Sequence, residues 1–408
     1  MTGTKSNTIT ISCLCGAAHQ TLPSPPNLPK VTLCACSSCR HLSGQLWTTY
    51  TPLTSPPTLT NLTPYSPSPS TITFYFCSTC GCHLFRRRHS QDAHEPHWEV
   101  TTGTIVSSPP FSLPEPPTIT TTTTTTHSNP TTTPLPATLS RLLTPLLTPT
   151  PPRDTPPPHL PASCHCARIT FTITPPSPSS LLPSSPFADL LLPYSRHPRT
   201  STSNPASTKW WLRDPSSPSS SSALASPPRT AAPHDLRYLA GTCACRSCRL
   251  ASGFEVQAWA FVPRFNIRFG PPPLAATAPP LDFSSSSSSP ASLGLRSYAS
   301  SPAAGAVREF CPTCGATVFW HDANRPDLID VSVGLLRSEV EGEGEGVQPY
   351  PYLYWWTERT SFAEEVRTGR DGGMAEWAGR LVEELEGALR KGRGGTTCSR
   401  DDTGEADK

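Results

Sequence analysis

The sequence predicts a mainly β protein that contains two tandem metal-binding domains. Short stretches of alternating apolar and polar residues, typical of strands, accompany blocks of closely spaced cysteines. One cysteine block occurs twice, as CACSSCRHLSG at 34–44 and as CACRSCRLASG at 243–253. Each copy lies between a Cys-x-Cys pair upstream and a Cys-x-x-Cys-Gly turn downstream. The repeated pattern accounts for fourteen of the sixteen cysteines, so we interpret the chain as two copies of one zinc-binding domain.

The first domain is predicted to span residues 8–107. Residues 8–11, 71–76 and 98–106 alternate between apolar and polar side chains and are expected to be strands. The run Arg86-Arg87-Arg88 is expected to be a solvated strand end. A Pro/Thr-rich, disordered linker is predicted at 108–160, in which 139–147 offers at most a short helical turn between prolines.

The second domain is predicted at 163–366, with strands at 168–173, 256–262, 316–320 and 328–335. Two Ser/Pro-rich insertions, 175–233 and 271–302, interrupt it and are expected to be disordered loops because they contain too little apolar surface to order themselves. Residues 373–391 have apolar side chains at intervals of three and four, which predicts an amphipathic helix that packs on its own domain, with a dimer contact as the alternative. A disordered tail with Cys398 is expected at 392–408.

Composition excludes several classes of function. Lys and Arg number 32 and Asp and Glu number 30, which gives a net charge of +2 and no basic surface of the kind that binds nucleic acid. No stretch reaches the roughly 20 apolar residues of a membrane span, and the first residues contain no apolar signal core. We therefore expect a cytoplasmic protein without direct nucleic-acid or membrane partners. In that reducing compartment paired cysteines act as metal ligands, and a disulfide framework is the alternative.

The outer cysteines of each copy predict a closed, structural zinc site. A Cys-x-x-Cys-Gly turn presents two sulfur atoms to one ion, and the Cys-x-Cys pair can supply the other two. Such four-cysteine sites contribute to folding and leave no position for a substrate. The predicted ligands are Cys13, Cys15, Cys77 and Cys80 in the first copy, and Cys164, Cys166, Cys311 and Cys314 in the second.

The central cysteines predict a different, open zinc site with three thiolate ligands. The sets are Cys34, Cys36 and Cys39, and Cys243, Cys245 and Cys248. His41 or Cys82 would be a fourth ligand in the first copy, but Leu250 and Ala316 stand at the matching positions of the second. Zinc with three protein ligands is the pattern of a catalytic site; closure of the site by a distant residue is the alternative.

Three thiolates and one zinc dication sum to a charge of roughly −1, so the ion is suited to hold an incoming thiol as a thiolate rather than to ionise water. Arg40 and Arg249 follow the last ligand of each set. Each is either a cation that offsets this charge or an ordinary helix or surface residue.

The cysteine pattern resembles that of the glutathione-dependent formaldehyde-activating family, which includes relatives of centromere protein V. The resemblance is carried by Cys13-Leu14-Cys15-Gly16, 34–44 and Phe76-Cys77 to Gly81, and by Cys164-His165-Cys166, 243–253 and Phe310-Cys311 to Gly315. It covers the first copy nearly throughout and the second copy apart from its insertions. Ala167 departs from the family pattern, because Gly16 stands at the matching position of the first copy.

The resemblance implies a zinc-stabilised β-tent fold with two zinc ions per domain, the outer one structural and the central one catalytic. It also implies a carbon–sulfur lyase that adds glutathione, or another small thiol, to formaldehyde or a related small aldehyde. A catalytically silent, zinc-scaffolded protein-binding module is the alternative. In a third hypothesis one copy is active and the other has become structural.

Overall fold

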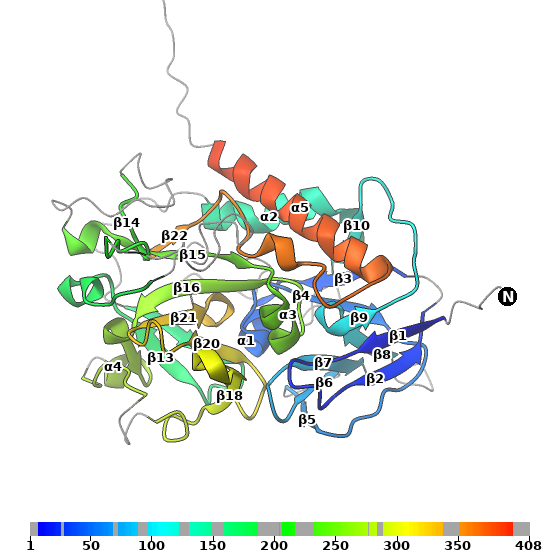
Figure 1. Cartoon of the computed structure of the whole chain (residues 1–408), viewed down its shortest axis with the longest axis horizontal. Coiled ribbons are helices and arrows are strands. Elements are labelled where there is room, and N and C mark those ends of the chain that lie inside the picture. Colours follow the sequence, from blue (N-terminus) through cyan, green and yellow to red (C-terminus); the bar gives the residue numbers. More distant parts are fainter. Residues whose placement is uncertain are drawn as a thin grey trace, which may run out of the picture.

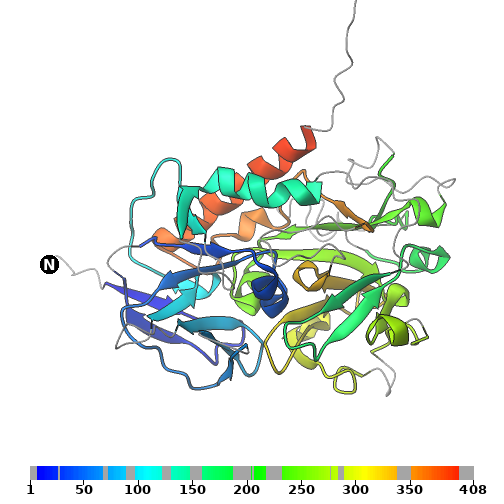
Figure 2. The same cartoon turned by 180° about the vertical axis from the view of Figure 1, so that it is seen from behind.

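Two large β-sheets, one in each half of the chain, form the frame of the computed structural model (Figures 1 and 2). The structure describes residues 7–25, 28–67, 72–88, 97–121, 130–147, 159–186, 204, 206–216, 232–275, 277–283, 289–337 and 351–394. In this part of the chain, the first large sheet has the strand order β11-β10-β3-β4-β8-β7-β6-β5. The second has the order β14-β15-β16-β21-β20-β19-β18, with β22 paired to β15. The mainly β fold predicted from the sequence is confirmed.

The N-terminal half also has a small sheet of order β2-β1-β9. Its elements are β1 (Thr8–Ile11), β2 (Gln20–Pro23), β3 (Thr32–Cys34), α1 (Ser37–Ser43), β4 (Thr48–Pro52), β5 (Leu62–Tyr65), β6 (Ile72–Cys77), β7 (His83–Arg88), β8 (His97–Thr101), the 3₁₀ turn η1 (Thr102–Thr104), β9 (Ile105–Ser107), β10 (Thr118–Thr121), β11 (Thr131–Pro134) and α2 (Leu135–Leu147).

The C-terminal half has a small sheet of order β12-β13-β17. Its elements are β12 (Leu160–Ser163), β13 (Thr170–Ile173), η2 (Pro178–Leu181), β14 (Leu212–Arg213), η5 (Pro233–Asp235), β15 (Arg237–Cys243), α3 (Arg246–Ser252), β16 (Gln257–Pro263), η6 (Arg264–Asn266), β17 (Ile267–Phe269), α4 (Pro272–Ala275), β18 (Arg296–Ser301), η8 (Pro302–Ala304), β19 (Ala306–Phe310), β20 (Thr317–His321), β21 (Leu328–Ser332), η9 (Val333–Leu335), β22 (Leu353–Trp355), η10 (Ala363–Glu365) and α5 (Gly373–Gly394).

The two halves place equivalent elements in equivalent positions. In each large sheet, a short helix follows the strand that ends at the first central cysteine. The helix α1 leads from β3 to β4, and α3 leads from β15 to β16. Each of these strands also gains a parallel neighbour from the end of its own half, β10 beside β3 and β22 beside β15. The strand order β10-β3-β4-β8-β7-β6-β5 thus matches β22-β15-β16-β21-β20-β19-β18.

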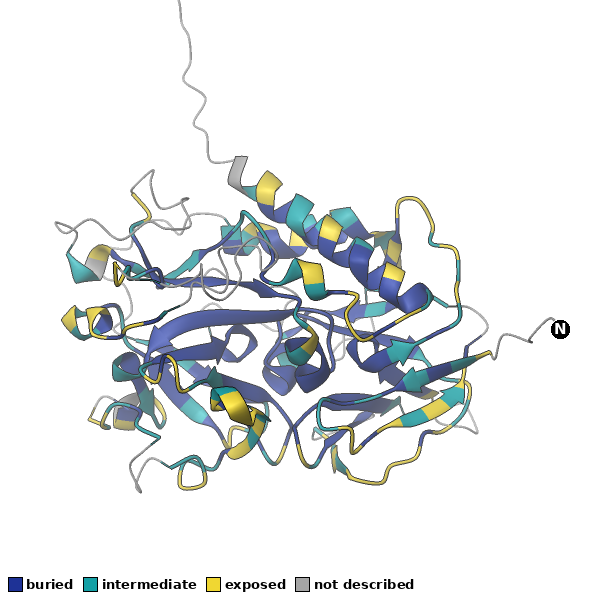
Figure 3. Cartoon of the chain, viewed as in Figure 1, coloured by how far each residue is buried: buried dark blue, intermediate teal, exposed yellow. Residues whose placement is uncertain are grey.

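The halves pack through the same surfaces, in the manner of an isologous dimer within one chain. The Gly103 N–H donates to the carbonyl of Gly253 over 3.1 Å, and the Gly334 N–H donates to the carbonyl of Gly44 over the same distance. The helix α1 therefore lies against η9 of the other half, and α3 lies against η1. Buried residues fill the region between the sheets, and one continuous apolar cluster includes residues of both halves (Figure 3).

The segment 108–160 departs from the expected disordered linker. Its described part forms β10, β11 and the helix α2, while 122–129 and 148–158 lie outside the described residues. The apolar side chains of α2 recur on one face and are buried: Leu135, Leu139, Leu142, Leu143 and Leu146. Pro136 stands in the first turn of α2, where its missing N–H costs no helical hydrogen bond, whereas Pro145 lies inside the helix and removes one such bond near its C-terminal end.

The C-terminal helix α5 extends close to the predicted bounds, but it does not pack only on its own domain. It lies alongside α2 from the N-terminal half, as Figures 1 and 2 show. The Met374 N–H donates to Ser108 Oγ over 3.0 Å, and the Gly373 N–H donates to the carbonyl of Pro109. Two amphipathic helices thus cover each other's apolar faces. The tail from residue 395 onward, including Cys398, lies outside the described residues.

The two insertions also contain ordered elements among their described residues. Trp210 and Trp211, in the first insertion, are at most 1% exposed, and Trp210 packs edge-to-face on Phe261 with ring centroids 4.8 Å apart. In the second insertion β18 pairs with β19. Residues 187–203, 205, 217–231, 276 and 284–288 lie outside the described part of the chain. None of the described helices is both long enough and apolar enough to span a membrane.

Candidate metal centres

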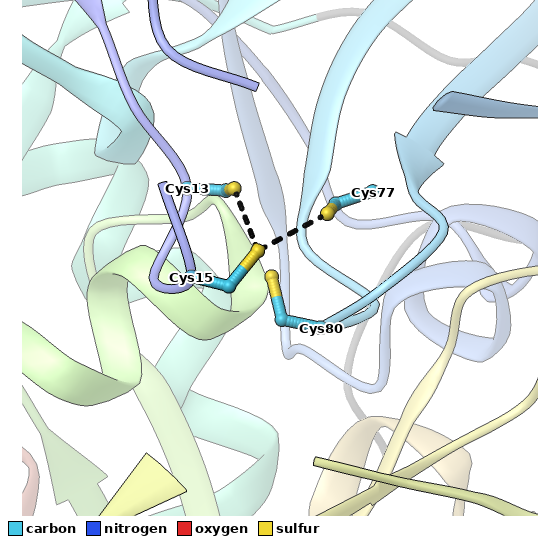
Figure 4. Close-up of side chains that lie close together, drawn as sticks. All are labelled: Cys13, Cys15, Cys77 and Cys80. Atoms are coloured by element: carbon cyan, nitrogen blue, oxygen red, sulfur yellow. Dashed lines mark hydrogen bonds between the residues drawn. The ribbon is translucent and has the colours of Figure 1, made fainter. Parts of the chain in front are cut away.

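The outer cysteines come together at the edge of each half. Cys13 and Cys15 lie in the turn after β1, Cys77 ends β6, and Cys80 lies in the turn that leads to β7. Their side chains point toward one another (Figure 4). Cys13 Sγ lies 3.4 Å from Cys15 Sγ, which in turn lies 3.5 Å from Cys77 Sγ. Gly81 closes the turn at a φ of +77°, a conformation that favours glycine.

The C-terminal half repeats this geometry. Cys164 Sγ and Cys311 Sγ each lie 3.5 Å from Cys166 Sγ, and Gly315 closes the turn at a φ of +77°. In each outer set all four sulfur atoms lie within 4.8 Å of one another. No disulfide joins any of the described cysteines. The sequence-predicted outer ligands are therefore brought together as two sets of four.

These distances fit a tetrahedral zinc site. A Zn–S bond of about 2.3 Å places the sulfur atoms of a tetrahedron about 3.8 Å apart, close to the observed separations. The crowded thiols also compete for protons: hydrogen bonding to Cys77 raises the pKa of Cys13 to about 12, whereas hydrogen bonding to Cys80 lowers the pKa of Cys15 to about 7. A dication held by all four thiolates would relieve this competition, so the outer sets suit a closed structural ion.

The central sets are built on the start of a helix. Cys34 ends β3, Cys36 is the N-cap of α1, and Cys39 lies in its first turn, with Cys34 Sγ 3.3 Å from Cys36 Sγ. Hydrogen bonding to Cys36 and burial both raise the pKa of the Cys34 thiol, which reaches about 11. The three sulfur atoms lie within 4.8 Å of one another. The helix ends at Gly44, where φ is +79°.

The second central set has the same construction. Cys243 ends β15, Cys245 is the N-cap of α3, and the sulfur of Cys245 accepts a hydrogen bond from the Cys248 N–H over 3.3 Å. In the described part of the chain, no histidine, aspartate, glutamate or further cysteine joins either set of three. Cys82, a candidate fourth ligand, instead donates to the carbonyl of His83 over 3.4 Å. Each central set thus offers three sulfur ligands.

The arginine that follows each central set is buried and is not a surface residue. Arg249 is 1% exposed and reaches across to the other half, where its Nη1 donates to the carbonyl of Gly103 over 2.7 Å. Its Nη2 donates to the carbonyl of Thr368 over 3.1 Å. Burial lowers the pKa of Arg249 to about 10. Arg249 therefore joins the two halves, a role that the sequence did not reveal.

A buried ion pair lies near the first central set. Arg86 is fully buried, which corrects the prediction that 86–88 is a solvated strand end, and its Nε donates to Glu99 Oε2 over 2.5 Å. Burial alone would raise the pKa of Glu99, but the charge and hydrogen bonds of Arg86 hold it at about 2. The guanidinium also stacks over Tyr50, 3.7 Å from the ring centroid. The paired strands β7 and β8 place Arg86 directly opposite Glu99.

A different arginine lies beside the second central set. Arg308, on β19, donates from Nη2 to Ser247 Oγ over 3.0 Å and to Cys248 Sγ over 3.5 Å. Trp259, Trp320 and Phe362 pack around the same cysteines. The sequence reasoning missed Arg308, Trp320 and Phe362; the signal that could have found Arg308 is a charged residue within the apolar pattern of its strand.

Comparison with known proteins identifies one family. Residues 8–113 match the family model described as glutathione-dependent formaldehyde-activating enzyme. No curated protein and no solved structure matches the chain. The matched segment contains the first outer and first central cysteine sets, whose geometry suits metal binding. Residues 8–113 of the chain are therefore similar to the glutathione-dependent formaldehyde-activating enzyme family.

Proposed function

We propose that the chain is a zinc-dependent carbon–sulfur lyase that adds a small thiol, such as glutathione, to formaldehyde or a related small aldehyde. One observation carries the proposal: each half combines a four-sulfur set with a separate three-sulfur set that no fourth described ligand joins. The family match of residues 8–113 supports it. Cys34, Cys36 and Cys39, and Cys243, Cys245 and Cys248, are the proposed catalytic metal ligands.

We also propose that residues 163–366 form a second domain of the same family beside the first at 8–107. The matching strand order of the two large sheets supports this, as do the matching helices α1 and α3 and the matching cysteine sets. The family model itself matches only the N-terminal segment. The described part of the intervening segment, with β10, β11 and α2, then completes the first domain.

The reaction needs an ionised thiol next to an aldehyde. Zinc bound by three thiolates has a position for an incoming thiol and favours its ionised form at neutral pH. The sulfur forms a bond to the carbonyl carbon, the carbonyl π electrons move to oxygen, and that oxygen takes the proton that the thiol lost. The chain holds the two reactants together and so removes the translational cost of bringing them into contact.

We expect purified, chelator-free protein to contain about four zinc ions, two for each half. Elemental analysis of the full chain against protein concentration measures this directly. A value near two would mean that only the outer sets bind metal, and the proposed function would then lose its site.

The zinc-replete chain should accelerate formation of S-hydroxymethylglutathione, and the double variant Cys36→Ser, Cys245→Ser should give only the uncatalysed rate. Adduct formation has to be followed directly, for example by NMR exchange, because the uncatalysed reaction is already fast. Wild-type protein that gave the background rate with glutathione and with other small thiols would refute the lyase. The zinc-scaffolded protein-binding module would then be the better interpretation.

A further inference from the structure

The two central cysteine sets have the same ligands but differ in their exposure to solvent. In the N-terminal half, Cys34, Cys36 and Cys39 are 1%, 2% and 1% exposed. In the C-terminal half, Cys243 and Cys248 are 6% and 5% exposed, and Cys245 is only partly buried. An incoming thiol can therefore approach the C-terminal set more readily.

The charges beside the two sets differ as well. Near the N-terminal set, Arg86 donates to Glu99 from Nε over 2.5 Å and from Nη2 over 2.8 Å, and Arg88 Nε donates to the same carboxylate over 2.9 Å. In the C-terminal half, Trp320 occupies the position of Arg86, and Trp259 occupies that of Tyr50, as the matching strand registers show. Beside the N-terminal set, the Arg86 guanidinium is thus bound to a carboxylate, whereas two indole rings occupy the matching positions beside the C-terminal set.

The C-terminal set has its own cation, Arg308. Its side chain is 3% exposed, and its hydrogen bonds go to Ser247 Oγ and Cys248 Sγ, with no carboxylate partner among the described residues. Its Nε is buried and has no hydrogen-bond partner. An unneutralised buried cation is costly unless an anion lies nearby, so this guanidinium indicates a negatively charged site.

Aromatic side chains form the wall beside this cation. Trp259 is buried against the cysteines, and Trp320 and Phe362 are partly exposed next to it. Apolar rings around a sulfur ligand reduce the number of water molecules that compete for it and strengthen nearby charge interactions. Cys245 and Ser247 are both partly exposed.

The geometry points to the C-terminal central set as the one that accepts the thiol substrate, with Arg308 as the positioning residue. This inference rests on the proposed function. Three thiolates and a dication sum to roughly −1, and a fourth thiolate, from the substrate, brings the sum to roughly −2. Arg308 donates to Cys248 Sγ and offsets one of these charges, whereas the hydrogen bonds of Arg86 go to Glu99 and Thr32 and to no described cysteine. Of the two sets proposed above as catalytic, only the C-terminal one then takes the thiol substrate, and the N-terminal set only binds its ion.

The number of thiols bound tests the inference on the unmodified full chain. Equilibrium dialysis of zinc-replete protein against radiolabelled glutathione should give one bound thiol per chain, and S-methylglutathione, which has no ionisable thiol, should not compete. Two thiols bound with similar affinity would overturn the inference and leave the proposed function intact. No bound thiol on fully zinc-loaded protein would overturn the proposed function itself.

Variants of Arg308 test its role. Arg308→Met should weaken glutathione binding about tenfold or more, as expected for loss of a charge-assisted contact, and Arg308→Lys should restore part of the affinity because it restores the charge. Arg264→Met is the matched control: this arginine pairs with Asp327 away from both central sets, and its loss should leave binding unchanged. Unchanged binding in Arg308→Met, with four zinc ions retained, would contradict the assignment, and so would failure of Arg308→Lys to bind more tightly than Arg308→Met.

Discussion

Cys80→Ser, which removes one proposed zinc ligand of the N-terminal outer set, is expected to destabilise both halves of the molecule. Zinc bound by four cysteines contributes about 10–16 kcal/mol in small zinc-binding peptides, whereas the net stability of a folded protein is about 5–15 kcal/mol. Loss of this ion should therefore lower the free energy of unfolding by at least about 5 kcal/mol. Calorimetric unfolding of the variant and the wild type, both purified without chelator, would measure the change.

The effect should extend to the other half because each outer turn is bonded to the other half's central helix. The Leu14 N–H, between Cys13 and Cys15, donates to the carbonyl of Leu250 on α3 over 2.9 Å. Reciprocally, the His165 N–H, between Cys164 and Cys166, donates to the carbonyl of His41 on α1 over 3.0 Å. We therefore expect a single calorimetric transition, together with faster amide hydrogen exchange in α3 of the Cys80→Ser variant.

Cys82→Ala is the matched control for Cys80→Ser. Cys82 is fully buried two residues away, but it lies outside the four-sulfur set, and alanine already stands at the equivalent position 316. This variant should keep its zinc and lose little stability. Two separate transitions in Cys80→Ser, one of them at the wild-type temperature, would show that the halves unfold independently.

The cysteine sets were accessible to sequence reasoning because their geometry is local. In a Cys-x-x-Cys-Gly turn the spacing alone directs both sulfur atoms to one point, and the duplicated pattern distinguished the repeated ligands from Cys82. The contact between Cys15 and Cys77, which are 62 residues apart in the sequence, brings the Cys-x-Cys pair and the Cys-x-x-Cys turn together. The pairing of the outer turns was inferred from ligand count, and the structure brings the same residues together.

The ordered parts of the Pro-rich segments could not be predicted from local residue spacing. The Pro/Thr-rich composition of 108–160 predicted a disordered linker, but α2 packs its leucines against α5, more than 200 residues further along the chain. Trp210 likewise finds its partner, Phe261, in another element. The average composition of a segment does not show that a few of its large side chains pack against residues far away in the sequence.

The contact between the halves could not be predicted from the sequence for the same reason. Gly253→Ala, which disturbs this contact, is the second variant for which we expect a large effect. Gly253 ends α3 at a φ of +89°, and a Cβ there would lie 1.9 Å from the carbonyl oxygen of His83 in the other half. The left-handed backbone alone costs a non-glycine residue about 1–2 kcal/mol. The overlap with a backbone atom cannot be relieved by a rotamer change, so the halves would have to move apart. We expect a total loss of at least about 3 kcal/mol of unfolding free energy.

Gly16→Ala separates the contribution of the backbone from that of the contact. Gly16 has a similar φ of +79°, but a Cβ there would meet no atom within 4 Å, and Ala167 adopts a φ of +57° at the equivalent position of the second half. This variant should therefore lose only about 1 kcal/mol. Urea unfolding of both variants, with zinc content checked before each titration, measures the two losses. Because α3 also carries Cys248, displacement of α3 in Gly253→Ala should weaken glutathione binding as well. Equal losses in the two variants would mean that the close approach of α3 to the other half contributes nothing to stability.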